Sequence, residues 1–594
     1  MVLENLNPNQ KKAVLSENGP LLIVAGAGTG KTKTLTSRLI YLLQSGINPQ
    51  NICAITFTNK AAKEMLDRTI KNIKNPKIVN DLFIGTFHSL GAKILKQEAP
   101  ILKRNKNFII FDDNDSFYLI KKIVKNFKTK NSAGYFYNLI SKIKNESIHL
   151  EEILESGQDD KIILDIFKEY ELELEKHNAF DFDDLIQKVV LIFKKNKNIL
   201  EKYQNQFQYI LVDEYQDLNN IQYEMIKLLA QKSKNINVVG DDAQTIYSWR
   251  GSNIKIFLNF EHDWPEANIV FLEENYRSTS NILEAAQAII SKNIYQRPKN
   301  LFTNNEKGEL IKIIETQNEE EEALFVAKEI KKLIKNKNYK SIGILYRINS
   351  QSRAIEQALN FEEISYKIFG GIRFYERKEI KDILAGLRFI YNNQDNLSLE
   401  RLKKILNQKK LNLFFENIKN IKTNSKSPTE FINLFLQNTN YLNYLEKNFT
   451  NFNDRLENIK ELIYFASGFK TLEEFLEKIA LVQPQDNQKN QNAFLELMTI
   501  HLAKGVEFDC VFIIGATEGI LPHKLSYNKI EEMEEERRLM YVAMTRAKKE
   551  LFISFYKEPS RFLFDIPQHL IDFQNLSGEK TEFVDDEMNY IHLD

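Results

Sequence analysis

The stretch Ile23-Val24-Ala25-Gly26-Ala27-Gly28-Thr29-Gly30-Lys31-Thr32 decides the fold of this chain. The apolar run at residues 21–24 predicts a buried parallel strand, and residues 32–43 follow with helical periodicity. Strand, glycine-rich loop and helix in this order form a phosphate cradle, because glycine lets backbone N–H groups come close and a helix N-terminus favours an anion. Lys31 would reach β- and γ-phosphate oxygens, and Thr32 would place a hydroxyl on Mg²⁺. Ala25 replaces the first glycine of the usual G-x-x-x-x-G-K-[ST] pattern.

Length and composition narrow the class of protein. The 594 residues are enough for about three to four domains. The chain carries 81 Lys and Arg against 81 Asp and Glu, so no net charge attracts a polyanion. Any nucleic-acid binding must therefore come from local basic patches and aromatic side chains.

The two cysteines and the N-terminus indicate the compartment. Cys53 and Cys510 each lie in an apolar, strand-like run, and their spacing suits neither a metal nor a disulfide scaffold. The N-terminal residues show no signal-peptide pattern, and no apolar run approaches membrane-spanning length. We therefore expect buried thiols and a cytoplasmic location.

Strand and helix signals alternate in the first half of the chain, which predicts a doubly wound α/β domain. Between these signals, residues 91–184 are mostly amphipathic helix and indicate an insertion. The acidic run at residues 180–185 closes it, and a helix start is a better interpretation of its carboxylates than a metal site. The expected strands are residues 21–24, 52–57, 82–84, 209–212 and 237–239, and the first two are each followed by a helix (32–43 and 60–73).

The second half predicts another α/β domain with its own helical insertion. A Lys- and Asn-rich helical stretch at residues 383–490 interrupts it. The run Glu319–Glu322 predicts a solvated helix N-terminus. The expected strands are residues 310–314, 342–346, 495–500 and 510–514.

Two further stretches carry chemistry. The strand at residues 209–212 ends in Asp213-Glu214, and such a pair suits Mg²⁺-dependent hydrolysis, with Asp213 holding the ion and Glu214 polarising the attacking water. Residues 240–251 place an amide, Gln244, shortly before Tyr247-Ser248-Trp249-Arg250. This spacing predicts that only a short stretch of chain separates Gln244, which would contact the γ-phosphate, from the aromatic side chains that would stack on a base.

The chain resembles superfamily 1 DNA helicases of the UvrD/Rep/PcrA type, and the resemblance runs from Leu6 to about Leu563. Nine matching stretches occur in family order, so coincidence is excluded. They are the phosphate loop, Thr56–Ala62, Gly85–His88, Val212–Asp217, Gly240–Tyr247, Glu274–Thr279, Gly370–Asp382, Met498–Phe508 and Glu535–Ala547.

The resemblance implies an α/β fold with two RecA-like P-loop domains, each with a mainly helical inserted subdomain. The first domain would comprise residues 1–90 and 185–275, with the insertion at 91–184. The second would comprise residues 276–382 and 491–565, with a shortened insertion at 383–490, and 566–594 would be a short C-terminal tail.

It also implies ATP and Mg²⁺ as cofactors. The catalytic residues would be Lys31, Asp213, Glu214, Gln244, Arg277 and Arg546, with Thr32 and Asp213 on the metal. Gln10 would read adenine, which competes with its interpretation as a helix cap, Tyr276 would stack on the base, and Glu507 would bind ribose. The remaining nucleotide contacts would be Ala25, Gly26, Ala27, Gly28, Thr29, Gly30 and Lys33.

For DNA, the resemblance implies stacking on Phe57, Tyr247 and Trp249, with further contacts from His88, Arg250 and His523. The expected partners are single-stranded DNA and 3′-tailed duplex DNA. Residues 407–413 lack the Gly-x-Gly turn with which relatives hold duplex DNA. We therefore expect a 3′–5′ single-strand translocase and DNA helicase in repair or replication. The alternative is a translocase that strips proteins from DNA with weak unwinding. A nucleotide-switched binding module is disfavoured, because a switch needs no hydrolytic residues such as Glu214 and the two arginines.

Overall fold

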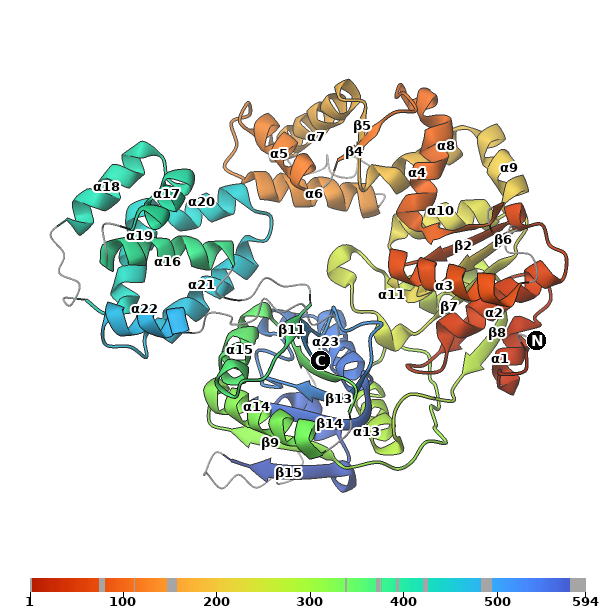
Figure 1. The fold of residues 1–594 in the computed structure, drawn as a ribbon. Coiled ribbons are helices and arrows are strands. Elements are labelled where there is room, and N and C mark those ends of the chain that lie inside the picture. The colour runs from red at the N-terminus through yellow and green to blue at the C-terminus, as the bar shows by residue number, and fades with distance from the viewer. Residues whose placement is uncertain are drawn as a thin grey trace, which may run out of the picture. The chain divides into compact units, whose positions relative to one another are not determined.

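The computed structural model describes residues 3–73, 79, 81–111, 113–146, 158–336, 339–369, 374, 377–391, 395–419, 426–481 and 494–576. The chain divides into two units by its internal contacts. Figure 1 labels the helices and strands of both. Unit 1 comprises residues 1–277, 293–304 and 373–483, and unit 2 comprises residues 278–292, 305–372 and 484–594.

Unit 1 is built on a six-stranded parallel sheet in the order β3-β2-β6-β7-β1-β8. Because all strands run the same way, the segments that follow their carboxyl ends meet at one edge of the sheet. The strands are β1 (Leu21–Ala25), β2 (Ile52–Thr56), β3 (Phe83–Thr86), β6 (Tyr209–Val212), β7 (Ile236–Gly240) and β8 (Asn268–Leu272).

Helices cover both faces of this sheet, as the alternation of buried residues in β1 requires. Leu21 and Ile23 pack against α1 (Pro8–Val14), α2 (Lys31–Gln44) and α3 (Asn59–Asn72). Leu22 and Val24 point to the opposite face. That face is covered by α4 (Phe87–Glu98), α8 (Asp184–Lys195), α9 (Lys197–Gln206), α10 (Asn220–Ala230), α11 (Ile254–Leu258) and α12 (Phe260–Asp263).

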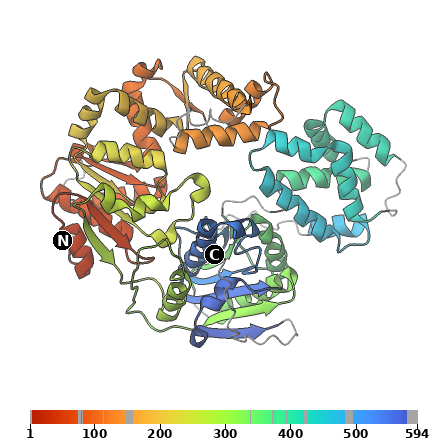
Figure 2. The ribbon, with the colours of Figure 1, turned by 180° about the vertical axis from the view of Figure 1, so that it is seen from behind.

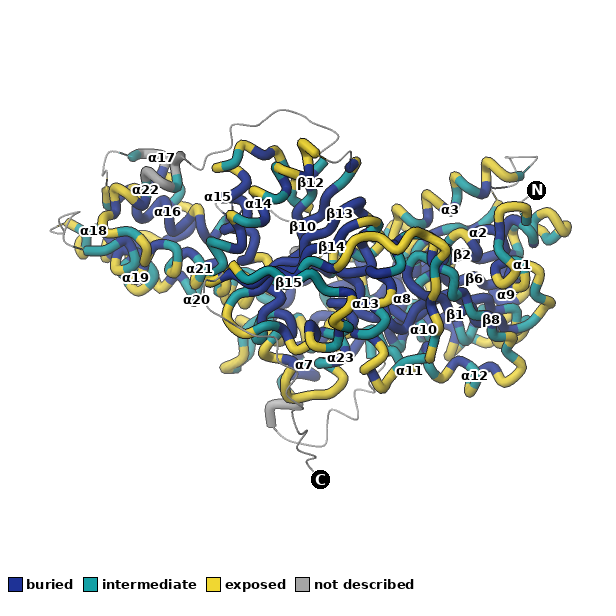
Figure 3. Tube along the Cα trace, turned by 90° about the horizontal axis from the view of Figure 1, so that it is seen from below, coloured by how far each residue is buried: buried dark blue, intermediate teal, exposed yellow. Residues whose placement is uncertain are grey.

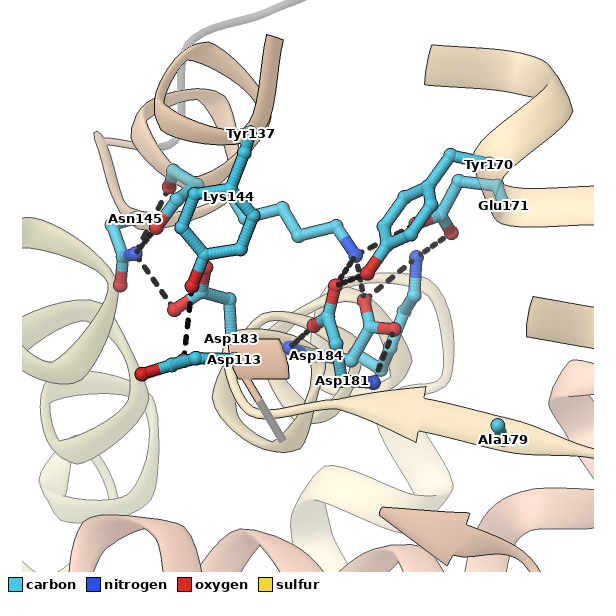
Figure 4. Close-up of polar contacts among 12 residues, drawn as sticks. Asp113, Tyr137, Lys144, Asn145, Tyr170, Glu171, Ala179, Asp181, Asp183 and Asp184 are labelled. Atoms are coloured by element: carbon cyan, nitrogen blue, oxygen red, sulfur yellow. Dashed lines mark hydrogen bonds and ion pairs between the residues drawn. The ribbon is translucent and has the colours of Figure 1, made fainter. Parts of the chain in front are cut away.

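Between α4 and α8 lie α5 (Asp113–Val124), α6 (Ala133–Glu146) and α7 (Gln158–Lys176), with a two-stranded parallel sheet of β4 (Ile109–Phe111) and β5 (Ala179–Asp181). A buried lysine joins these elements to α8 (Figure 4). Lys144 Nζ lies 2.6 Å from Asp181 Oδ2, 2.8 Å from Asp184 Oδ1 and 2.8 Å from Glu171 Oε1. Burial works against its charge, yet these carboxylates hold the pKa of Lys144 well above the usual value.

The acidic run at residues 180–185 therefore serves as the partner of a buried ammonium. Asp184 does begin α8, as the helix-start interpretation predicts. In the described part of the chain, no group of three or more His, Cys, Asp or Glu side chains is arranged to hold a metal ion.

The last segment of unit 1, residues 373–483, contains seven helices among its described residues. They share a core of aromatic and aliphatic side chains. They are α16 (Lys378–Tyr391), α17 (Asn396–Ile405), α18 (Gln408–Ile418), α19 (Pro428–Thr439), α20 (Tyr441–Asn448), α21 (Phe452–Ala466) and α22 (Leu472–Leu481). Six of the thirteen residues of the family-like stretch at 370–382, namely 370–373, 375 and 376, lie outside the described residues, and the stretch ends within α16.

Unit 2 contains a seven-stranded parallel sheet in the order β11-β12-β10-β13-β14-β9-β15. Strands from distant parts of the sequence lie side by side in it, so green and blue strands share one sheet (Figure 2). The central strands are buried (Figure 3). The strands are β9 (Ile311–Thr316), β10 (Ile342–Tyr346), β11 (Lys367–Ile368), β12 (Leu495–Thr499), β13 (Phe508–Ile513), β14 (Ala547–Tyr556) and β15 (Ile571–Asn575).

One face of this sheet packs on α14 (Glu319–Asn336) and α15 (Ser352–Phe361), and α13 (Ser280–Ile290) and α23 (Ile530–Met544) pack on each other and on β14. None of the helices in the described part of the chain combines the length and apolar composition that crossing a bilayer requires.

Two expectations need correction. The N-terminus of α14 is not uniformly solvated, because Glu322 is buried and accepts a hydrogen bond from Gly515 N at 2.8 Å. The buried Arg353 pairs with Glu320 at 3.2 Å. The predicted tail, residues 566–594, contains β15, which is a strand of the second sheet, while residues 577–594 lie outside the described residues.

Candidate nucleotide and nucleic-acid site

The loop between β1 and α2 has the geometry of a phosphate cradle. Gly30 caps α2 with φ 84°, and Gly28 has φ 70°, a left-handed conformation that glycine adopts without strain. A Cβ on Gly28 would lie 2.6 Å from Asn275 Nδ2, so no larger residue fits there. The N–H groups of the first turn of α2 and its dipole are therefore presented at the carboxyl edge of the sheet.

Lys31 is the first residue of α2 and is poised for an anion. Its Nζ is buried and makes no hydrogen bond, and its nearest acidic partner, Glu214 Oε2, is 3.6 Å away. A buried ammonium without hydrogen bonds is costly, and a phosphate oxygen would satisfy it. This observation shows that the residues present fit a nucleotide phosphate.

The next residue, Thr32, contacts the end of β6. Its hydroxyl donates to Asp213 Oδ2 at 2.8 Å. Burial, with the neighbouring Glu214 carboxylate, raises the pKa of Asp213 to about 7, although Thr32 and Lys31 act in the opposite sense. A hydroxyl and one carboxylate are ligands that Mg²⁺ takes together with phosphate oxygens, so the donor set fits this ion.

Glu214 is held in a strained backbone conformation. Its φ of 51° lies in the left-handed region, which is costly for a residue other than glycine and tends to occur at functional sites. Gln216 Nε2 donates to Glu214 Oε2 at 2.6 Å, while Gln216 Oε1 accepts Asp241 N at 3.0 Å. Gln216, a residue for which the sequence predicts no role, thus ties the Glu214 carboxylate to the end of β7.

Gln244 is buried at the end of a short 3₁₀ turn (Asp242–Gln244) after β7. Its Nε2 donates to Asp241 Oδ2 at 2.7 Å. Asp241 therefore fixes both the Gln244 amide, which is expected to contact the γ-phosphate, and the Gln216 side chain.

Residues 274–277 follow β8 and run along the phosphate loop. Asn275 Nδ2 donates to Ala27 O at 2.7 Å, and Tyr276 N donates to Gly28 O at 3.0 Å. The Tyr276 ring is 49% exposed, and its hydroxyl donates to Glu274 Oε2 at 2.6 Å. The structure thus brings Tyr276 and Arg277 to the loop, with the tyrosine ring open to a ligand.

Gln10 acts as a capping residue in this structure. It forms a capping box with Asn7, and its Nε2 donates to Thr29 O at 2.9 Å. A Cβ on Gly30 would lie 3.0 Å from Gln10 Nε2, so the amide is adjacent to the loop. Lys33 is exposed, and its Nζ donates to Asn5 O at 2.7 Å.

The predicted DNA-contacting residues of unit 1 follow the carboxyl ends of β2, β3 and β7. Phe57 and Tyr247 stack with ring centroids 5.5 Å apart and an interplanar angle of 13°. Trp249 is 65% exposed, and the Arg250 guanidinium lies 4.6 Å from its ring centroid. Exposed, cation-backed rings of this kind are suited to stacking on bases.

His88 lies beside a further aromatic residue that the sequence analysis does not assign to DNA. The Phe182 ring is 49% exposed, and its centroid is 4.2 Å from that of His88. Burial lowers the pKa of His88 to about 4, so it presents a neutral ring at physiological pH. The feature of the sequence that could have indicated Phe182 is an aromatic residue between the aspartates of the acidic run at residues 180–185. We call Phe57, His88, Phe182, Tyr247 and Trp249 the aromatic set.

Three of the predicted site residues, Arg546, Glu507 and His523, belong to unit 2. Arg546 is buried, with Nε donating to Val542 O at 3.0 Å and Nη1 to Val506 O at 3.3 Å. Glu507 pairs with Lys548 at 2.6 Å. His523 begins a 3₁₀ turn, and its N–H donates to Glu536 Oε2 at 3.0 Å.

Comparison with known proteins identifies the family. The model of the UvrD/REP helicase N-terminal domain matches residues 6–265, and that of the UvrD-like helicase C-terminal domain matches residues 270–454 and 404–558. The chain belongs to the UvrD/Rep helicase family. It is 39% identical to the ATP-dependent DNA helicase PcrA of Staphylococcus aureus (strain Mu50) over 98% of this chain and 88% of the relative. For PcrA of Staphylococcus epidermidis (strain RP62A) the identity is 39% over 98% of this chain and 89% of the relative. The two-domain, RecA-like α/β fold expected from the sequence is confirmed by the two sheets and this membership.

Proposed function

We propose that this UvrD/Rep family member is an ATP-dependent 3′–5′ single-stranded DNA translocase and DNA helicase that acts in DNA repair or replication. The observation that carries the proposal is the buried, hydrogen-bond-free ammonium of Lys31 beside Thr32, Asp213 and Glu214. Lys31 and Asp213 follow β1 and β6, and four of the aromatic set, Phe57, His88, Tyr247 and Trp249, follow β2, β3 and β7 of the same parallel sheet. Hydrolytic and stacking residues on one sheet edge are what a DNA-driven ATPase requires.

In this proposal, ATP binds with its phosphates on the loop at residues 25–33. Lys31 neutralises the β- and γ-phosphates, Thr32 and Asp213 hold Mg²⁺, and Glu214 accepts a proton from the attacking water. Bound Mg²⁺ would supply charge neutralisation at the phosphates. The adenine base stacks on Tyr276 next to Gln10, and Glu507 binds the ribose.

Gln244 contacts the γ-phosphate, and Arg277 and Arg546 stabilise the charge that develops on it. Phosphoryl transfer depends on positioning and charge neutralisation, and an arginine that acts in the transition state is worth about 10³–10⁵ in rate. At 1.36 kcal/mol per tenfold, this is roughly 4–7 kcal/mol.

Single-stranded DNA would stack on Phe57, Tyr247 and Trp249, with Arg250, His88 and His523 as further contacts. Phe182 extends this aromatic track, because its exposed ring lies against His88. Each stacked base contributes about 1–3 kcal/mol without regard to sequence. This mode of binding suits a chain whose net charge is zero. The domain limits expected from the sequence, apart from the tail at residues 566–594, and the cytoplasmic location are part of the same proposal.

The alternative is a translocase that strips proteins from DNA and unwinds poorly. The observation in its favour is that residues 408–418 form helix α18, capped by Asn407 and without glycine, where relatives carry a Gly-x-Gly turn. A loose grip on duplex DNA would leave translocation intact.

The test compares strand displacement from duplexes with a 3′ or a 5′ single-stranded tail, with wild-type protein and Lys31→Ala. We expect ATP-dependent displacement from the 3′-tailed duplex only. Lys31→Ala should lose hydrolysis but still bind single strands, because the aromatic set is elsewhere. Displacement from the 5′-tailed duplex alone would overturn the polarity. Displacement of streptavidin from a 5′-biotinylated single strand, without duplex unwinding, would favour the alternative.

A further inference from the structure

Residues 293–304, here called the strap, belong to unit 1, although the chain on either side of them belongs to unit 2. Main-chain bonds fix the strap beside the end of β8. Phe302 N donates to Glu273 O at 3.0 Å, and Asn275 N donates to Phe302 O at 2.7 Å. At its other end, Arg297 N donates to Asp242 Oδ2 at 2.9 Å. The strap therefore joins the segment after β8 to the segment after β7.

Lys299 points from the strap into the interior. Its side chain is 7% exposed, its Nζ lies 3.1 Å from Asp241 Oδ1, and it also pairs with Asp242. Both carboxylates are fully buried. Burial disfavours the ammonium, but the two carboxylates raise the pKa of Lys299 above its ordinary value. This lysine is the cation that faces two adjacent buried acids.

Asp241 in turn orients the proposed sensor. Its Oδ2 accepts the Gln244 Nε2 hydrogen bond at 2.7 Å, and its Oδ1 accepts Ala243 N at 3.2 Å. A carboxylate oxygen that accepts this hydrogen bond selects the amide orientation with Nε2 toward Asp241 and turns Gln244 Oε1 the opposite way. The position of the Asp241 carboxylate thus decides which end of the amide points away from it.

Without Lys299, two neighbouring carboxylates would repel each other in a buried site without the cation that lies between them. A displaced Asp241 carboxylate would no longer accept the Gln244 Nε2 hydrogen bond, and the amide would lose its fixed orientation. The strap also touches the phosphate loop, since a Cβ on Gly26 would lie 2.3 Å from Leu301 Cδ2. One segment therefore contacts both the loop and the residues that hold the sensor.

We propose that Lys299 is a positioning residue that holds the Asp241 carboxylate in place and so keeps Gln244 correctly oriented, which couples DNA on Tyr247 and Trp249 to ATP hydrolysis. The inference rests on the proposed function, because it needs a DNA-stimulated ATPase. Gln244 lies three residues before Tyr247, so a change in its orientation acts on the shortest covalent path between the two sites.

The experiment measures ATP hydrolysis with and without oligo(dT), together with thermal melting, for full-length wild type, Lys299→Met and Lys299→Met/Asp242→Asn. The double variant removes one positive and one negative charge, so Asp241 lies beside a neutral amide and no second carboxylate repels it. Lys144→Met is the matched control, since it deletes an equally buried lysine paired with two aspartates away from the nucleotide residues.

We expect Lys299→Met to lose at least tenfold in DNA stimulation, mainly in kcat, and the double variant to recover to within about threefold of wild type. Lys144→Met should melt at a lower temperature and keep its stimulation. The inference is overturned if Lys299→Met keeps its stimulation, if the double variant does not recover it, or if Lys144→Met loses it equally. Should Lys299→Met not fold, the double variant alone decides between recovery and loss. A wild type without DNA stimulation would instead overturn the proposed function.

Discussion

Gln216 Nε2 donates to Glu214 Oε2 at 2.6 Å while Gln216 Oε1 accepts Asp241 N at 3.0 Å. This side chain is fully buried and spans the ends of β6 and β7. A Cβ on Gly240 would lie 2.5 Å from Gln216 Oε1, so the close approach depends on glycine. The proposed general base is thus held by an amide that is itself anchored to the segment carrying Gln244.

Gln216→Met should lower kcat for ATP hydrolysis by about tenfold with little change in KM, because Glu214 keeps its charge but loses its fixed orientation. Steady-state kinetics with saturating oligo(dT) measure this. Gln204→Met is a matched control, since Gln204 is a buried amide that bonds only to Leu228 O among the contacts described for it. If both variants lose kcat equally, Gln216 has no specific role.

Arg277→Ala and Arg546→Ala should each cut turnover by orders of magnitude and leave nucleotide affinity within a modest factor. The melting temperature should distinguish the two variants. Arg546 is buried and donates to Val542 O and Val506 O, so its removal should also lower the melting temperature. Arg277 is only partly buried, and Arg277→Ala should melt near wild type. Loss of nucleotide binding with intact kcat would make either arginine a binding residue instead.

The limits of a strand were predictable from the sequence where a short apolar run is bounded by polar residues. Tyr209–Val212 and Ile342–Tyr346 were predicted with the limits that the structure shows. Strand β14 was not predicted, although it is the longest strand of the second sheet, because Ala547–Tyr556 begins inside a family-like stretch and its Lys-Lys-Glu start conceals the apolar alternation. Strand β5 was missed because Asp181 and its neighbours resemble a helix start.

The candidate site was predictable where a motif names the residue, and not where burial decides its role. Lys31, Asp213 and Glu214 stand in such motifs, and the structure brings them together. Lys299 and Lys144 look like the many solvated lysines of the chain, since a sequence does not show which ammonium meets two buried aspartates. Glu322 is concealed within a run of four glutamates for the same reason.

Glu322 should make stability depend on pH. Burial raises the pKa of Glu322 to about 7, and the hydrogen bond from Gly515 N only partly opposes this. Between its unfolded pKa, about 4.3, and 7 the folded state binds more protons than the unfolded state, so the free energy of unfolding falls as pH rises through this range. Glu322→Gln lacks this term and should melt increasingly above wild type from pH 5 to pH 8.

Melting curves across that range test this, with Glu329→Gln as a control on the same helix, where Glu329 pairs with Lys332 at 2.8 Å. A constant difference between Glu322→Gln and wild type would show that Glu322 is ionised throughout. A pH-dependent difference in the control would show that the charge of α14 as a whole is responsible.

The last prediction concerns the grip on duplex DNA. A Gly-x-Gly turn binds phosphate because its backbone N–H groups come close, but residues 407–413 have no glycine and begin helix α18. The Asn407 side chain accepts Lys410 N at 3.0 Å and so occupies one N–H that a phosphate would use. Phosphate would then be held by the Lys409 and Lys410 side chains. We expect duplex affinity to fall with a log–log salt slope of about 0.9 per phosphate contacted. Single-strand affinity, which depends partly on stacking, should fall less steeply.

Anisotropy titrations of tailed duplex and bare single strand across a salt series measure both slopes, and the Lys409→Ala/Lys410→Ala variant should flatten the duplex slope alone. The protein would then hold its single strand firmly and the duplex loosely, so that translocation is efficient and isolated unwinding is poor. Parallel slopes together with efficient unwinding at physiological salt would contradict this, because they require a duplex contact that does not depend on these two lysines.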